Sequence, residues 1–149
     1  NMDVRSLFAG TTLYLPVEVE GALFSVGDGH AAQGDGELCG TAIETTLGIE
    51  VSFDLLKGDS SPYPRFRAPA GAMREPCESL VTTGIGPDLF SAAQDAARYL
   101  VDRLGAEHGL APELAYCLLS VAADLRIAEI VNAPQWTVAC ALPLSIFDA

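Results

Sequence analysis

The spacing of apolar side chains changes once along this chain, near Pro87-Asp88, and that change restricts the fold more than any other feature. Upstream, apolar and polar residues alternate over 13–20, which is the period of a half-buried β-strand. Downstream, apolar residues recur every three or four positions over 88–104, and again after Pro112, which is the period of an amphipathic helix. Strands therefore come first and helices follow, an order typical of α+β folds.

Other segments extend this prediction. The second helix is expected to cover 112–131, and the first to end at Gly105 or Gly109. Further strands or short extended pieces are expected at 22–26, within 38–56, and at 65–67, 77–83 and 136–147. The buried side of the second helix is predicted to carry Tyr116, Leu119, Val121, Ala122 and Leu125. The predicted class is α+β and β-rich, with a largely antiparallel sheet or sandwich and two helices in the C-terminal half.

The charge balance restricts the partners. The 149 residues carry 8 basic and 20 acidic side chains, which gives a net charge of -12. Such a chain is a poor partner for nucleic acid or an anionic membrane, because no basic patch can replace counterions. Half of the residues are apolar, enough for a real core. Since no apolar run reaches about 18 residues and no signal peptide is visible, we expect a soluble, cytoplasmic protein.

Four cysteines are present, and none is spaced as C-x-x-C from another. We therefore expect Cys39, Cys77, Cys117 and Cys140 to be small core residues of a protein from a reducing compartment. A nucleophilic role for Cys39 is a weaker alternative, because no second histidine lies near it in the sequence to activate it.

The stretch V-G-D-G-H-A-A-Q-G-D-G-E, at 26–37, concentrates polar groups on a pliable backbone. It holds four glycines, three carboxylates, a glutamine and one of the two histidines. Asp28 and His30 are two residues apart, so in an extended chain both side chains point the same way. Carboxylate with imidazole suits zinc and similar divalent ions. The stretch therefore predicts part of a metal site.

Two ligands do not complete such a site. The others could come from Asp3, Asp35, Glu37 or a segment outside this sequence. Glu37 could instead act as a general base toward a metal-bound water, and Gln33 could donate to or accept from a small polar substrate.

Structural interpretations of the same residues stay open. Glycine and aspartate are ordinary residues of a hairpin turn, Glu37 could be a solvated residue at a strand edge, and Asp3 could be a turn or cap residue. His108 is expected at a helix end, where a cation is favourable. Asp124 and Arg126 are expected to form an ion pair or cap within a helix.

Several segments resemble, in order, those of the acetamidase/formamidase family. They are N-M-D, L-Y-L-P-V, G-A-L-F-S-V-G-D-G-H-A-A-Q-G-D-G-E-L-C-G-T-A-I-E, T-G-I-G-P-D-L-F, S-V-A-A-D-L-R-I-A-E-I-V and L-P-L-S-I-F. The resemblance runs over nearly all 149 residues, and G-D-G-H-A-A-Q-G-D-G-E is its most specific segment. It implies a β-rich α+β fold and the hydrolysis of short aliphatic amides, such as formamide or acetamide, to a carboxylate and ammonia.

Family members are longer than this chain, which is similar to their C-terminal half. The resemblance therefore implies that residues 1–149 are the C-terminal portion of a larger unit: a fragment, a processed chain or one half of a split enzyme. The expected partners are a small amide substrate, the missing N-terminal half or a second chain with further site residues, and further copies in a homo-oligomer.

The resemblance also implies a role for each residue. Asp28 and His30 are the first choices as ligands of a divalent metal, with Asp3 third; zinc is the expected ion and calcium an alternative. Glu37 is expected to take a proton from water and pass it to the leaving ammonia. Gln33 and glycine N–H groups are expected to hold the oxyanion.

A different class of function stays open as well. The chain could be a non-catalytic binding or assembly domain of the same fold, with a structural cation in its Gly/Asp loop. Oxygen-rich ligation with no open position would favour that alternative, and a histidine-containing site with an open position would favour catalysis.

Overall fold

The computed structural model describes residues 2–59 and 61–147, so Asn1 of the N-M-D motif lies outside it. A five-stranded antiparallel sheet of order β1-β4-β5-β7-β6 forms the centre, and β2 and β3 pair separately. The elements are β1 Thr12–Tyr14, β2 His30–Ala32, β3 Ile43–Glu44, β4 Arg65–Ala68, β5 Ser79–Gly86, α1 Leu89–His108, α2 Pro112–Ala122, β6 Asp124–Glu129, β7 Trp136–Pro143 and a 3-10 helix at Leu144–Phe147. The α+β class predicted from the sequence is confirmed.

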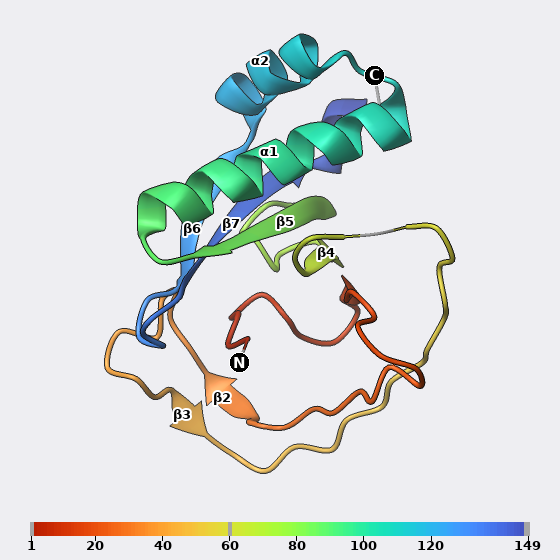
Figure 1. Cartoon of the computed structure of the whole chain (residues 1–149). Helices are drawn as coiled ribbons and strands as arrows, with labels where there is room; N and C mark the ends of the chain where they lie inside the picture. The colour runs from red at the N-terminus through yellow and green to blue at the C-terminus, as the bar shows by residue number, and fades with distance from the viewer. Residues whose placement is uncertain (1, 60, 148–149) are drawn as a thin grey trace.

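Each face of the sheet has its own apolar core. Figure 1 shows α1 across one face with α2 beyond it, and the N-terminal segment on the opposite side. Because side chains alternate along a strand, Leu80 and Leu142 face the helices and pack with Leu100. Val81, next along β5, contributes instead to the second core, with Phe66. The sheet thus separates the helical layer from the segment that carries the candidate site.

The helix α1 approaches β5 at Gly84. A Cβ at this position would lie 2.0 Å from the carbonyl oxygen of Ala92 and 2.5 Å from the backbone nitrogen of Ala96. One turn away, the Thr82 hydroxyl donates to the Ala96 carbonyl at 2.8 Å. Only glycine allows this contact, which explains its place inside an otherwise well-packed strand.

Both ends of α1 are defined by caps. The Asp88 carboxylate accepts from the Ser91 backbone N–H at 2.8 Å and from the Ser91 hydroxyl at 2.7 Å. At the other end, Gly109 adopts the left-handed conformation with φ of 67°, so the helix ends there and not at Gly105. His108 occupies the last turn, as predicted, and stacks on Phe147 with ring centroids 3.8 Å apart.

Asp88 gives a prediction about stability and pH. The hydrogen bonds from Ser91 lower the pKa of the Asp88 carboxyl, whose ordinary value is 3.8. A carboxyl with a lowered pKa in the folded state stabilises the fold above its ordinary pKa, and that contribution is lost as the pH falls through the folded-state value. We expect Asp88→Ala to lower the free energy of unfolding at pH 7, and the difference to shrink below about pH 4. Urea denaturation of both proteins across this range measures it; a difference that grows on acidification would contradict the cap.

The second helix is shorter than predicted, because the D-L-R-I segment is a strand. Helix α2 ends at Ala122, and β6 begins at Asp124 and pairs with β7. Ala115 and Leu119 are the buried residues of α2, whereas three residues expected there, Tyr116, Val121 and Leu125, are exposed. The apolar residues of this segment fit either the helix or the strand period, and the segment forms a strand because it pairs with the edge of β7.

The ion pair predicted within that helix therefore lies on a strand. Arg126 lies 3.9 Å from Asp124, and it also donates to the Met73 carbonyl at 2.6 Å. Its position ties β6 to the loop before β5.

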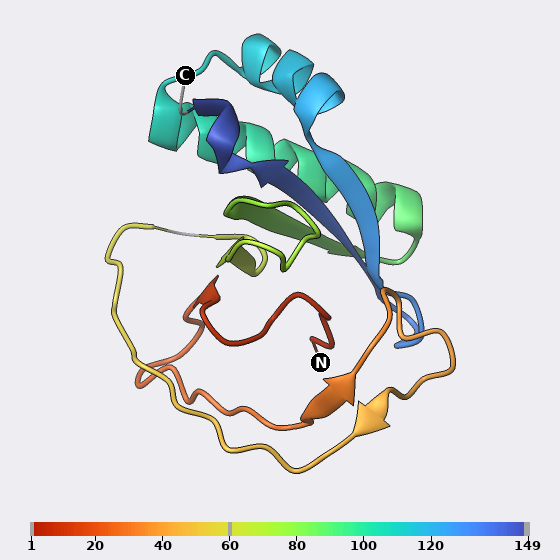
Figure 2. The same cartoon turned by 180° about the vertical axis from the view of Figure 1, so that it is seen from behind.

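The long β-like pattern of the first third is mostly not a sheet. Figures 1 and 2 show the chain between β1 and β4 as a wide arc, with β2 and β3 at its far side. The strands expected over 13–20 and 38–56 are reduced to the short β1 and β3, and the strand expected at 22–26 does not form. Leu23 and Leu38 are 78% and 81% exposed. The alternation is present, but the described residues provide no neighbouring strand to complete a ladder.

The cysteines also depart from expectation. Cys140 is buried, Cys77 is half-buried, and Cys39 and Cys117 are exposed, so the prediction of four core cysteines is wrong. Burial raises the pKa of the Cys140 thiol to about 12. Cys39 donates to the Thr41 carbonyl at 3.3 Å and has no contact with a histidine among the described residues, which leaves the nucleophile alternative unsupported. No helix in the described part of the chain is long and apolar enough to cross a membrane.

Candidate functional site

Two backbone contacts position the polar stretch. The first is the β2–β3 pair, which sets His30 directly opposite Glu44. The second is a parallel bridge between Gly36 and Glu129 at the end of β6, where the Gly36 N–H donates to the Ala128 carbonyl at 3.3 Å. Gly36 has φ of 84°, a conformation that favours glycine. The stretch is thereby fixed between the hairpin and the sheet.

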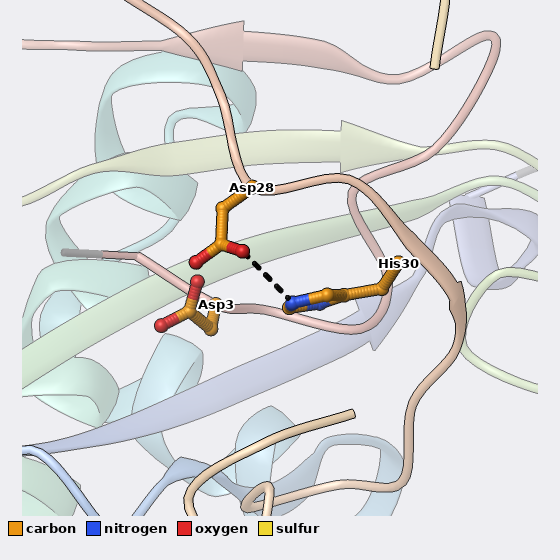
Figure 3. A group of neighbouring side chains, drawn as sticks. All are labelled: Asp3, Asp28 and His30. Carbon is orange, nitrogen blue, oxygen red and sulfur yellow. Dashed lines mark ion pairs between the residues drawn. The ribbon is translucent and has the colours of Figure 1, made fainter. Parts of the chain in front are cut away.

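The three residues expected to bind a metal come together. Asp3, Asp28 and His30 each offer a ligand atom, and these atoms all lie within 4.8 Å of one another. Figure 3 shows the Asp28 carboxylate aimed at the imidazole, with Asp3 beside it; Asp28 Oδ1 lies 3.4 Å from His30 Nε2. Asp3 thus joins two residues that lie 25 or more positions further along the chain.

The contacts of Gln33 determine which imidazole nitrogen is free. Its Nε2 donates to the Asp3 carbonyl at 2.7 Å, so its Oε1 is the atom that faces His30 Nδ1 at 3.2 Å. That oxygen can only accept, and Nδ1 must therefore carry the proton. In the neutral ring Nε2 then has its lone pair exposed to the carboxylates, as a metal ligand requires. Both ends of Gln33 contact the protein, so its role toward substrate stays a prediction.

A second possible ligand group shares the same imidazole. His30 Nε2 lies 3.8 Å from Glu37 Oε1 and 3.1 Å from Glu44 Oε2, and these atoms also cluster within 4.8 Å. Glu44 was not expected at the site, because it is 14 positions from His30 and only the hairpin register brings it there. Glu37 is buried, with φ of 47°, and Glu44 is exposed.

Burial and neighbouring charge shift the titration of the cluster. Burial, reinforced by the Asp3 carboxylate, raises the pKa of Glu37 above its ordinary value. For His30, burial opposes the charged form, but the hydrogen bond to Gln33 and the surrounding carboxylates outweigh it and raise its pKa. The pKa of Glu44 is lowered, first by the hydrogen bond from the Ala42 N–H. Of these two glutamates, Glu37 is thus the one that binds a proton more readily.

Two further residues of the site were missed by sequence reasoning. Glu129 accepts from the Asp3 backbone N–H at 3.4 Å, and Asn132 donates to the Asp3 carboxylate at 3.4 Å and to Glu129. Glu129 fell within the segment predicted as helix, where a site at a strand end could not be expected. The remaining candidate, Asp35, pairs with Arg5 at 3.4 Å and lies in neither ligand group.

The residues present fit a divalent cation. His30 Nε2 is buried and makes no hydrogen bond, although three carboxylates lie within 3.8 Å of it. A buried acceptor without a donor is costly, and a cation at this position would satisfy both it and the converging carboxylates. One imidazole with two or more carboxylates is a donor set that zinc accepts.

Comparison with known proteins gives the family. The acetamidase/formamidase family model matches residues 1–149. The acetamidase of Mycolicibacterium smegmatis is 45% identical over 65 residues, which make up 42% of this chain and 16% of that protein. The crystal structure of the acetamidase from Yersinia enterocolitica superposes with a TM-score of 0.82 at 33% identity, over 98% of this chain and 42% of that one. The acetamidase of Bacillus halodurans gives 0.75 at 33% identity, over 99% and 47%.

The chain thus spans less than half the length of these relatives, and its β-rich α+β fold matches the corresponding part of theirs. The family model covers the whole sequence, including the cluster around His30 and both strands that follow the helices. The chain belongs to the acetamidase/formamidase family.

Proposed function

We propose that this chain carries the metal-binding part of an amidase that hydrolyses short aliphatic amides, such as formamide and acetamide, to a carboxylate and ammonia. The observation that supports it best is the bare, buried Nε2 of His30, which faces Asp3 and Asp28 with the buried Glu37 beside it. A structural ion needs ligands alone, whereas hydrolysis also needs a base close to them. The family and the names of the relatives support the amide class.

Asp3, Asp28 and His30 would hold the cation. When bound, a divalent ion polarises the amide carbonyl and lowers the pKa of water toward about 7. Gln33 accepts from His30 Nδ1 through its Oε1 and donates to the Asp3 carbonyl through its Nε2. The protein thereby sets the direction of its ligand atoms before any ion arrives, which reduces the ordering cost of binding.

Glu37 is the proposed base. Its carboxylate accepts a proton as water adds to the carbonyl carbon, and it returns that proton to the nitrogen as the C–N bond breaks and ammonia leaves. A raised pKa makes the carboxylate a stronger base, and burial beside Asp3 provides that here. Amide and water thus become a carboxylic acid and ammonia, and the proton of the acid then passes to ammonia or to solvent, so no other reactant is needed.

We further propose that residues outside 1–149, from the same polypeptide or a second chain, complete the site and cover the arc. The chain matches 42% of the Yersinia enterocolitica acetamidase, and many large apolar side chains of the arc are exposed. Exposed apolar patches of this kind mark contact surfaces. Activity is therefore best measured on this chain combined with a segment that corresponds to the uncovered part of that relative. The chain alone is measured for comparison.

Replacement of Glu37 by glutamine tests the proposed base. Because glutamine keeps the shape and loses the basic oxygen, we expect Glu37→Gln to reduce ammonia release from acetamide by about 100-fold or more while zinc binding changes little. Zinc titration by calorimetry and a coupled ammonia assay give the two values. The matched control, Glu113→Gln, changes an exposed glutamate on α2 and should leave both unchanged.

The outcome also decides between the two ligand groups. Near-normal ammonia release by the Glu37→Gln variant would show that Glu37 is not the base. A parallel loss of zinc affinity would instead place Glu37 among the ligands, in the group it forms with His30 and Glu44. Bound metal with no ammonia release in any combination of segments would favour a binding domain with a structural ion.

A further inference from the structure

A polar cleft lies beside the proposed ligands, at the end of the sheet where β6 joins β7. It has a volume of about 250 Å³ and is lined by Ile85, Glu129, Asn132, Gln135 and Thr137. The reaction proposed above gives none of these residues a step, although Glu129 and Asn132 hold Asp3. Pockets for drug-sized ligands measure roughly 300–1,000 Å³, so this cleft suits a smaller molecule.

The sheet register builds the floor of the cleft. Thr137 on β7 is directly opposite Ile85 on β5 and directly opposite Glu129 on β6. Residues directly opposite in an antiparallel ladder point to the same face, so these three side chains form a row across three strands. The neighbouring Gly84 faces α1, which places the row on the opposite face, toward the N-terminal segment. The row runs from an apolar residue to a carboxylate.

The polar groups of the cleft have unused hydrogen-bonding capacity. Glu129 is only 3% exposed, and its carboxylate accepts from the Asp3 N–H and from Asn132. A carboxylate can accept about four hydrogen bonds, so lone pairs remain. In the described part of the chain, the side chains of Thr137 and Gln135 have no hydrogen-bond partner. A buried acceptor next to free polar groups is complementary to a small molecule that donates N–H bonds.

The cleft also adjoins the proposed metal ligands. Asn132, one of its lining residues, contacts the Asp3 carboxylate at 3.4 Å. An oxygen of that carboxylate lies within 4.8 Å of the ligand atoms of Asp28 and His30. The cleft is thus connected to the cluster through the contact between Asn132 and Asp3.

We propose that this cleft is the binding subsite for the primary amide, an inference that rests on the proposed amide hydrolysis. Glu129 and the Thr137 hydroxyl accept the two N–H bonds of the amide nitrogen, and Ile85 contacts the short alkyl group. The carbonyl is left free for the chemistry at the cluster. The small volume of the cleft, about 250 Å³, limits the alkyl group to a few carbons. The carboxylate disfavours the anionic product by repulsion.

The subsite can be tested by ligand binding to the whole chain, without turnover. In a ¹⁵N NMR titration we expect acetamide to shift the signals of Thr137 and of the Gln135 side chain. N,N-dimethylacetamide, which has no N–H, and acetate, which repels Glu129, should shift them at least about tenfold less at equal concentration. Glu129→Gln should weaken acetamide binding about tenfold, and the matched control Glu113→Gln, an exposed glutamate on α2, should not.

Equal shifts with N,N-dimethylacetamide, shifts confined to other residues, or unchanged acetamide binding by a folded Glu129→Gln protein would overturn the subsite. If that variant does not fold, the comparison of the three ligands on the unmodified chain decides alone. The two proposals fail separately. Acetamide binding in the cleft without any hydrolysis would contradict the proposed function. Hydrolysis without acetamide-induced shifts of the NMR signals of the cleft would contradict the subsite.

Discussion

Replacement of His30 by alanine is expected to abolish both metal binding and amide hydrolysis while the fold is kept. His30 is the member common to both ligand groups, and its buried Nε2 faces three carboxylates. Without the imidazole, these carboxylates repel one another with no nitrogen ligand between them, so we expect zinc affinity to fall by at least about 100-fold. Ammonia release should fall to the background rate. Calorimetry with zinc and a coupled ammonia assay measure the two effects.

The second histidine is the natural control. His108 lies at the end of α1, stacked on Phe147, and is in neither ligand group. His108→Ala should therefore keep zinc affinity and ammonia release, even where stability decreases. Zinc affinity within a few-fold of the unmodified chain in His30→Ala would show that the cluster is not the metal site.

The largest effect on stability is expected for Gly84→Ala. The new Cβ would lie 2.0 Å from the Ala92 carbonyl oxygen and 2.5 Å from the Ala96 nitrogen, and both are backbone atoms of α1. No side chain can rotate to relieve the overlap, so the helix must move off the sheet and disturb the packing of Leu80 against Leu100. We expect a loss of roughly 3 kcal/mol or more of unfolding free energy.

Urea denaturation of Gly84→Ala and Gly86→Ala tests this close approach. In Gly86→Ala the new Cβ would meet its nearest atoms at 3.4 and 3.5 Å, an ordinary contact, on the same strand and beside the same helix. This control should lose much less stability. If the two variants unfold at the same urea concentration, β5 and α1 are not in the close contact that these distances give.

The elements that local pattern determines were predictable. Helix α1 shows this best: it has a continuous apolar stripe, a capping aspartate and a terminal glycine, and its bounds follow from these residues. The segment after α2 could not be assigned in the same way. Its apolar residues satisfy a helix period, and the strand forms because β7 offers a free edge, which is a long-range contact.

More strand was predicted in the arc than forms there, for a related reason. An alternating pattern specifies which side chains could share a face, but a strand also needs a neighbour, and between β1 and β4 only β2 and β3 find each other. The site shows both cases. Asp28 and His30 meet as predicted, but not through an extended chain, because Asp28 has φ of 62° and lies outside β2. Glu44 reaches the cluster through hairpin register and Glu129 through the end of β6.

The most direct test of a metal-dependent amidase is ammonia release from acetamide before and after complete removal of metal. It is measured on this chain combined with a segment that corresponds to the part of its relatives that it does not cover. We expect release to stop on chelation, to return on addition of zinc, and to depend on His30. Release that continues at the same rate without metal, or fully zinc-loaded protein that releases no ammonia, would contradict a metal-dependent amidase built around His30.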